Sequence, residues 1–437
     1  MTTLLQSAPE SAPAAVTTWP IKLRLSAMMF LQYFMQGAYL PIVSVYVQDY
    51  LGFDSREVGW FGSALAVGPL FAPVVVGQLV DRHFATQRVL AVCHLLAGIV
   101  MLVLYAQTQF WPVILLGTVY SVLYIPTMML TNSLALSHLA NREREFPRIR
   151  MWGTIGFIVP AWLIEYCWLS GLEADELAVA RGVAFALAGV AGLVMAAYCL
   201  SLPDTPPAGR PNARFAPAEI AGLLADRRLL VLVLISFLIA VVHNFYFVWN
   251  SPFLTSVLAR SGIRGAWEQR ISSLGQVSEI AVMAVLGLAL ARWGFKRVML
   301  IGTLGYLLRC LLLAAAGSEV TAGASLALAT VAQAMHGLCF GCFLAAAFIY
   351  VDRIAPADAR GSMQTLYGNF VVGLGAVAGA WLAGQVGYAC EMPGAGAPQH
   401  AWVPLWLSSA AVAGICAIGF AALFPDDRQP ESSPVHV

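Results

Sequence analysis

One short stretch of the chain carries three side chains that could together bind a polar, aromatic solute. Arg150, Thr154 and Phe157 are spaced i, i+4 and i+7, so an α-helix places all three on one face. Their guanidinium, hydroxyl and aromatic ring suit a solute that offers carbonyls, ring nitrogens, hydroxyls and a flat π-face. The alternative interpretation is that Arg150 is only the last basic residue of a loop.

A second pair of polar side chains interrupts an apolar run further along the chain. Gln276 and Glu279 are spaced i, i+3 and share one face of a helix. A carboxylate in apolar surroundings must pair, take up a proton or face water. Glu279 could therefore alternate between protonated and charged forms, or accept hydrogen bonds from a solute beside Gln276. The structural alternative is an ion pair with Arg309 in the neighbouring run.

A third polar stripe occurs in the first apolar run. Gln32, Gln36 and Tyr39 are spaced i, i+4 and i+7, and Tyr33 follows Gln32 directly. Such a stripe either faces a cavity or forms hydrogen bonds to neighbouring helices, which is common in membrane bundles. The spacing leaves both interpretations open.

These polar groups stand out because charge is scarce in this chain. Of 437 residues, 59% are hydrophobic and only 11% are charged, against about 25% charged in a soluble protein. The 24 Lys and Arg nearly balance the 23 Asp and Glu, so no strong field attracts nucleic acid. The composition excludes a disordered chain, a coiled coil and an ordinary soluble enzyme, and it favours a membrane protein embedded in the lipid bilayer.

Run length indicates how the chain crosses the bilayer. A spanning helix needs roughly 20 mostly apolar residues, and these runs lack the strict alternation of a β-barrel strand. We therefore expect an all-α membrane protein with 12 transmembrane helices. The runs lie near 23–47, 58–80, 89–106, 112–138, 150–169, 178–201, 229–258, 271–291, 298–316, 323–352, 362–388 and 402–424.

The distribution of basic residues predicts the orientation. With both termini in the cytoplasm, 18 of the 24 Lys and Arg fall on or beside the cytoplasmic side and five on or near the other, as the positive-inside rule requires. The longest polar connection, rich in Pro and Arg, falls between the sixth and seventh runs and reads as a linker. The expected organisation is a flexible cytoplasmic tail (1–20), an N-terminal six-helix bundle (21–201), a cytoplasmic linker (202–228), a C-terminal six-helix bundle (229–424) and a second cytoplasmic tail (425–437).

Motifs for covalent chemistry, cofactors or metals are absent from the sequence. No Walker loop, HExxH or GxSxG motif occurs, so we expect neither an enzyme nor a cofactor. Cys339 and Cys342 form a CxxC, but inside an apolar run and without a second Cys or His pair. They are better explained as small packing residues, and we expect no metal site.

Several segments resemble known transporters. The turn GQLVDRHFATQRVL (77–90) after the second run, with a weak echo in ARWGFKRVML (291–300), resembles the major facilitator superfamily. A narrower resemblance covers nearly the whole chain: FPRIRMWGTIGFI (146–158) is similar to the fifth-helix signature of the bacterial nucleoside:proton symporters. Matching pieces are LQYFMQGAYL (31–40), YIPTMMLTNSLAL (124–136), GQVSEI (275–280), HGLCFGCF (336–343) and YVDRIAPADARGSMQTL (350–366).

The resemblance implies a function and roles for particular residues. It implies an inner-membrane importer that carries nucleosides together with protons by alternating access. Gln276 and Glu279 match nucleoside-binding positions of the family, Asn244 matches an amide placed against the base, and Phe340 matches an aromatic residue that stacks on it. Charged pairs at cytoplasmic helix ends form gating salt bridges in the superfamily, and here they are Asp81, Arg82, Asp352 and Arg353.

The chain also departs from the family pattern. Phe247 replaces a second amide, His336 stands where the family often has Tyr, and Gly341 stands where it often has an aspartate. Because histidine titrates near neutrality, His336 could replace the lost acid in proton handling, or it could be a neutral packing residue. Two other functions remain open: a permease or exporter for a sugar or drug-like solute, and a nucleoside-binding membrane receptor without net transport.

Overall fold

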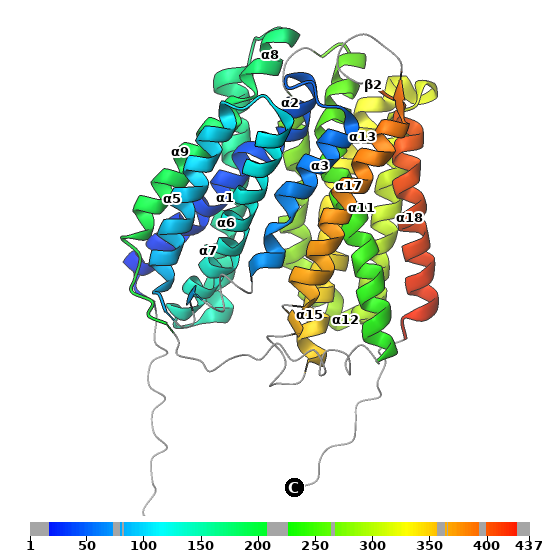
Figure 1. Ribbon diagram of the computed structural model, residues 1–437. Helices are drawn as coiled ribbons and strands as arrows, with labels where there is room; N and C mark the ends of the chain where they lie inside the picture. The colour runs from blue at the N-terminus through cyan, green and yellow to red at the C-terminus, as the bar shows by residue number, and fades with distance from the viewer. Residues whose placement is uncertain are drawn as a thin grey trace, which may run out of the picture.

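The computed structural model describes residues 17–72, 79–80, 83–207, 226–263, 267–355, 363–364, 366–392 and 399–425. These residues are nearly all helical, and the long helices lie side by side (Figure 1). Among them, strands β1 (Glu391–Met392) and β2 (Gln399–His400) form one short antiparallel pair. The predicted all-α architecture is confirmed.

The N-terminal half starts with two helices, α1 and α2, in close succession and continues with longer ones. The α1–α7 and α5–α9 pairs make its most extensive helix contacts. Its helices are α1 (Trp19–Tyr39), α2 (Val43–Asp49), α3 (Ser55–Ala66), the 3₁₀ turn η1 (Gly68–Phe71), α5 (Thr86–Tyr105), α6 (Phe110–Ser137), α7 (Arg142–Ile164), the π-helical turn η3 (Glu165–Leu169), α8 (Ala174–Ala180) and α9 (Val183–Cys199).

The C-terminal half is built mainly around α11, α12, α17 and α18. Its tenth predicted span is divided into several helical pieces, one of them π-helical. The helices are α11 (Arg227–Arg260), α12 (Glu268–Ala316), η4 (Glu319–Ala324), α13 (Ser325–Ala334), α14 (His336–Cys339), the π-helical turn η5 (Phe340–Ala345), α15 (Ala346–Ile354), the π-helical turn η6 (Leu366–Val372), α17 (Gly373–Ala389) and α18 (Trp402–Leu423).

The helices correspond closely to the predicted spans. Nine helices in the described part of the chain are long and apolar enough to cross a membrane. One of the nine, α12, combines the predicted spans 271–291 and 298–316, and the chain turns between them at Gly294, whose φ is 76°. Glycine adopts this left-handed conformation without the steric cost of a Cβ atom. The first two predicted spans begin with α1 and α3, and residues 73–78 of the second lie outside the described part.

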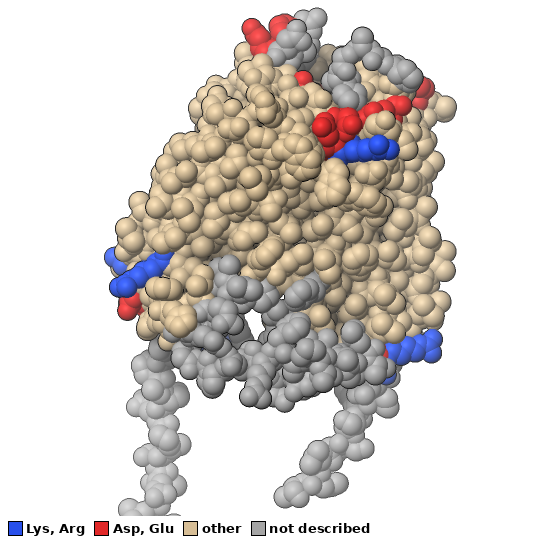
Figure 2. All heavy atoms as spheres, in the orientation of Figure 1, with Lys and Arg blue, Asp and Glu red and all other residues tan. Residues whose placement is uncertain are grey.

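Charge and apolar surface divide the molecule into a middle band and two ends. On the face drawn in Figure 2, the described Lys, Arg, Asp and Glu side chains gather toward the ends, and the broad band between them is uncharged. We call the end at which β1 and β2 lie the hairpin end. We call the opposite end, at which α9 stops and α11 starts, the linker end (Figure 1). An uncharged band between polar ends is what a bilayer-spanning bundle requires.

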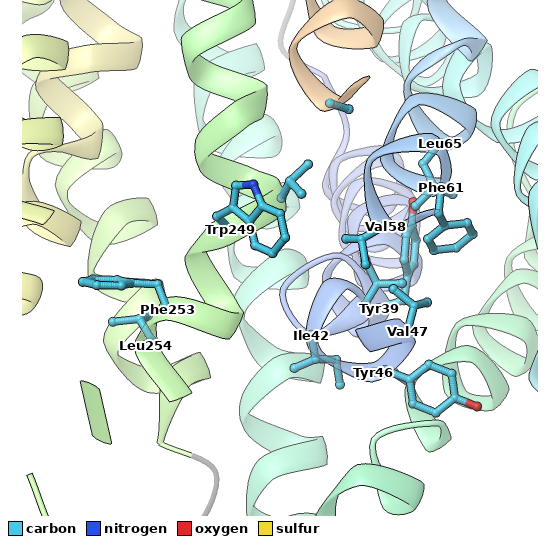
Figure 3. Close-up of a cluster of buried hydrophobic side chains, with 14 of the residues drawn as sticks. Tyr39, Ile42, Tyr46, Val47, Val58, Phe61, Leu65, Trp249, Phe253 and Leu254 are labelled. Atoms are coloured by element: carbon cyan, nitrogen blue, oxygen red, sulfur yellow. The ribbon is translucent and has the colours of Figure 1, made fainter. Parts of the chain in front are cut away.

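The apolar core is arranged differently at these two ends. At the hairpin end one cluster of buried side chains includes Tyr39 and Phe61 from the N-terminal half with Trp249 and Phe253 from α11 (Figure 3). Toward the linker end there are two clusters, one confined to each half. The halves therefore share a core near the hairpin end and have separate cores near the linker end.

The helices α3 and α17 bring the backbones of the two halves into contact. A Cβ atom added to Gly59 of α3 would lie 2.5 Å from the Cα of Gly384 in α17, which is closer than two carbon atoms can pack. Only glycine at these positions lets the two backbones touch. This pair of helices also makes the largest number of contacts between the halves.

Candidate substrate-binding cavity

A cavity of about 340 Å³ lies between the two halves. Its volume falls in the range of small-molecule sites, about 300–1,000 Å³. Side chains from α1, α3 and α7 form one wall, and side chains from α11, α12, α14, η5 and α17 form the other. All eight residues predicted for substrate or proton binding line it: Arg150, Thr154, Phe157, Asn244, Gln276, Glu279, His336 and Phe340.

The N-terminal wall is formed mainly by α7. Arg150, Thr154 and Phe157 all lie within this helix and reach the same cavity, as their spacing predicted. The guanidinium carbon of Arg150 lies 4.2 Å from the ring centroid of Tyr33, where the π-face attracts a cation. The alternative interpretation of Arg150 as a loop residue is therefore wrong.

Glu279 on α12 faces this wall from the opposite half. Its side chain is 29% exposed, and it interacts electrostatically with Arg150. Gln276, one turn earlier, lines the same cavity. The alternative ion pair between Glu279 and Arg309 does not form, because His336 lies between them: its Nδ1 is 3.1 Å from Arg309 Nη1 and its Nε2 is 3.8 Å from Glu279 Oε2.

Aromatic and imidazole rings line the C-terminal side of the cavity. The ring of His336 is nearly parallel to that of Phe340, with centroids 6.4 Å apart. His243 lies 5.5 Å from His336 and 5.0 Å from Phe247 between ring centroids. Sequence reasoning had not included His243 in the site. Its i, i+4 spacing with Phe247, next to the candidate Asn244, was the available signal.

The polar stripe of α1 has two roles. Tyr33, Gln36 and Tyr39 line the cavity. Gln32 is instead fully buried, where it donates to Thr127 Oγ1 at 2.9 Å and contacts His94 Nε2 at the same distance. Both interpretations of the stripe are thus realised, on different faces of one helix.

The predicted gating residues are only partly within the described structure. Asp81 and Arg82 lie outside the described residues. Asp352 Oδ1 accepts a hydrogen bond of 2.7 Å from Gln364 Nε2, and the guanidinium carbon of Arg353 lies 5.6 Å from the Phe295 ring centroid. Both residues belong to α15 at the linker end.

At the hairpin end, polar contacts join the two halves. Arg181 Nη2 lies 2.9 Å from Glu268 Oε1 of the other half, and Arg181 Nη1 lies 3.4 Å from Asp49 Oδ2 of its own half. A second ion pair joins Glu165 of η3 to Arg270 of α12. These ion pairs link the two halves on the hairpin side of the molecule.

The β-hairpin adds a third cross-half contact at the same end. Ser55, at the start of α3, donates to Glu391 Oε1 from its backbone nitrogen at 3.0 Å, and its hydroxyl lies 2.8 Å from His400 Nε2. The hydroxyl also donates to the same carboxylate oxygen. The hairpin thus holds the first turn of a helix from the other half.

Gly341 occupies a tight position on η5. A Cβ atom there would lie 2.7 Å from Cγ1 of Val282 on α12. An aspartate, which the family often has at this position, would therefore require Val282 to move. The glycine leaves the space that the Val282 side chain occupies.

The fold is that of the major facilitator transporters, as a comparison with solved structures shows. The crystal structure of the nucleoside transporter NupG superposes with a TM-score of 0.80 at 24% identity, covering 92% of this chain and 99% of that one. A D-xylose–proton symporter structure gives a TM-score of 0.65 at 13% identity, covering 93% and 98%. These likenesses confirm the predicted fold.

The sequence comparisons identify the family. The family model described as nucleoside H+ symporter matches residues 19–429, so the chain belongs to this family. The protein YegT of Escherichia coli (strain K12) is 31% identical over 418 residues, 92% of this chain and 93% of its own. The xanthosine permease of the same organism is 28% identical, covering 94% and 97%. The chain is thus a transporter and not an enzyme, and neither a sugar or drug exporter nor a receptor is favoured.

Proposed function

We propose that this chain imports nucleosides together with protons and binds them in the cavity between its halves. The observation that carries the proposal is the convergence of eight predicted side chains, from both halves, on one cavity. Binding between two halves that move relative to each other is the basis of alternating access. A site built from only one half could not couple binding to that motion.

The chemistry of the two walls suggests how a nucleoside is held. Phe157 and Phe340 offer ring faces for the base, and Asn244 offers amide groups for its edge. Gln276 and Glu279 can bind the ribose hydroxyls. Arg150 and Thr154 complete the site with donors from the opposite wall.

Glu279 is the proposed proton carrier. It is a partly exposed carboxylate that faces the cavity, and it interacts electrostatically with Arg150 across it. A carboxylate so placed can be charged while it interacts with Arg150 and take up a proton when the halves move apart. His336 is the second candidate from the sequence.

We further propose that the linker end faces the cytoplasm, that the protein is in the inner membrane, and that Asp81, Arg82, Asp352 and Arg353 take part in gating there. The excess of Lys and Arg on that side supports the orientation. The shared core and the ion pairs at the hairpin end fit a state in which substrate would leave toward the cytoplasm.

Uptake of labelled uridine and adenosine into proteoliposomes tests the function. Wild-type protein should accumulate both solutes above equilibrium when an inward proton gradient is applied. Glu279→Gln should lose at least about tenfold of that accumulation, because the amide cannot exchange a proton, while exchange without a gradient persists.

A matched control is Glu319→Gln, the same change at a carboxylate that is 88% exposed. It should accumulate nucleoside as the wild type does. Full accumulation by Glu279→Gln would contradict the role of that carboxylate. No uptake of any nucleoside by folded wild-type protein would contradict the function itself.

A further inference from the structure

Arg309 is a buried cation in the middle of the C-terminal half. Its side chain is 1% exposed, and within the described residues no carboxylate lies at ion-pair distance from it. Its guanidinium carbon lies 3.2 Å from the ring centroid of Tyr246. Its Nη1 lies 3.1 Å from His336 Nδ1. A guanidinium buried against a ring face, an imidazole and the Cys339 thiol, with no carboxylate among these contacts, calls for an explanation.

The contact with His336 determines where the imidazole carries its proton. Arginine stays protonated in proteins and has no acceptor, so Arg309 must donate and His336 Nδ1 must accept. The neutral ring then carries its hydrogen on Nε2. That nitrogen is directed toward Glu279, at 3.8 Å from Oε2, so a small shift would bring the two groups within hydrogen-bond distance.

A second proton on His336 would be opposed from several sides. It would turn Nδ1 into a donor facing the guanidinium, which breaks the hydrogen bond and places two like charges side by side away from water. The titratable and charged groups around the ring are Glu279 and Arg309 of α12, His243 and Tyr246 of α11, and Cys339 on its own helix. Of these, only Glu279 would favour a charged ring.

The neighbouring histidine is arranged in the same way. Tyr306, also on α12, places its hydroxyl 2.8 Å from His243 Nδ1. Both imidazoles therefore direct Nδ1 toward α12, and their rings lie beside each other at the cavity. Tyr306 and Arg309, one turn apart on α12, thus each orient one imidazole at the cavity.

We propose that Arg309 is a positioning residue that keeps His336 neutral, with its Nε2–H directed at Glu279 and the cavity. His336 then donates a hydrogen bond to a nucleoside hydroxyl or to the carboxylate, and Glu279 alone carries the transported proton. This inference rests on the proposed function for its substrate. The state of the ring can be measured without any substrate.

The first experiment observes the ring directly. Full-length protein labelled with 15N-histidine is compared with His336→Leu to assign the signals of His336. The wild type should show one protonated and one unprotonated ring nitrogen between about pH 5 and 8. Arg309→Met, which removes the donor at similar volume, should mix the two tautomers, and Arg309→Lys should restore the wild-type signal. A doubly protonated ring in the wild type would overturn the proposal.

The second experiment measures equilibrium uridine binding at several pH values. His336→Leu should bind roughly tenfold more weakly at every pH, since one hydrogen bond is lost. Arg309→Met should weaken binding by a similar factor. The double variant should be no weaker than His336→Leu alone, because Arg309 acts through the ring. Additive losses would overturn the proposal.

The control is Arg297→Gln, a change at an exposed arginine of the same helix, which should bind as the wild type does. If wild-type protein binds no nucleoside, the proposed function fails. The 15N signals of the wild type still decide the inference about Arg309 in that case, and they require no variant of Arg309 to fold.

Discussion

The two ends of the molecule hold the halves together in different ways. At the hairpin end, one apolar cluster and several polar contacts cross from one half to the other. At the linker end, the apolar cores are separate. The charged contacts described there, such as Lys22 with Glu145 and Asp352 with Gln364, each join residues of one half.

This difference indicates which contacts favour one access state over the other. Contacts within a half are present whichever way the halves are tilted, so they stabilise all states equally. Contacts across the halves exist in only one state and bias the equilibrium toward it. The hairpin-end contacts should therefore determine the populations, and those at the linker end should affect mainly folding.

The largest effect is expected from Glu268→Gln. Arg181 and Glu268 are 4% and 1% exposed. Removing one partner of a buried pair costs about 3–5 kcal/mol when the other charge is left alone, and here Asp49 remains beside Arg181, so that figure is an upper bound. The change should shift the equilibrium toward a state with a separated hairpin end. Distances between spin labels at Glu176 and Glu319 should lengthen, and those between labels at Arg88 and Arg297 should shorten.

The control for Glu268→Gln is Glu319→Gln, which changes an exposed carboxylate at the same end. Because Glu319 is then substituted, the hairpin-end labels are placed at Glu176 and Val320. Glu319→Gln should leave both distance distributions unchanged. Unchanged distances in Glu268→Gln would show that the buried pair does not select the state.

A change of pH should have an intermediate effect on the balance between the two states. The titrating group is His400, which lies outside the spanning helices. Burial lowers the pKa of His400 to about 4, although the nearby Glu391 raises it. When the hairpin end separates, α3 and Ser55 move away from His400. Water then reaches the imidazole, and its pKa rises toward the ordinary value of about 6.5. The contribution of His400 to the stability of the state with a joined hairpin end is therefore fully present above about pH 6.5. As the pH falls toward 4, this state is destabilised by at most about 3 kcal/mol relative to the separated one.

Acidification should thus lengthen the hairpin-end distance, and His400→Gln should remove most of that response. Glu391→Gln separates the contribution of the neighbouring carboxylate. An identical pH response in wild type and His400→Gln would rule out this histidine as the source.

The smallest effect is expected from Lys22→Ala at the linker end. The Lys22 side chain is 28% exposed and its partner Glu145 lies in the same half, and ion pairs in contact with solvent contribute little to stability because water and salt screen them. Thermal unfolding should change slightly, while both spin-label distances stay as in the wild type. A clear change in either distance would contradict the distinction between the two ends.

The cavity was more predictable from the sequence than the hairpin end. Arg150, Thr154 and Phe157 follow a helical period, so one helix is enough to place them together. Arg181 and Glu268 come from different halves and become partners only after both bundles have formed. Nothing in their local sequence distinguishes them from other charges at helix ends.

Arg309 shows the same limit within the site. Its sequence suggested Glu279 as a partner, because a buried cation and a buried carboxylate occur in neighbouring runs. The structure inserts His336 between them. The position of α14 along the axis of α12 determines which side chains meet. Hydrophobic periodicity along one helix does not predict how two helices are shifted relative to each other.

The glycine contact between α3 and α17 has a mechanical consequence. The backbones touch at Gly59 and Gly384, one helical turn from Ser55 and the hairpin. The contact therefore belongs to the joined hairpin end, and a bulkier residue at either position would hold α3 and α17 apart. Such a change would shift the balance toward the state in which the hairpin end is separated.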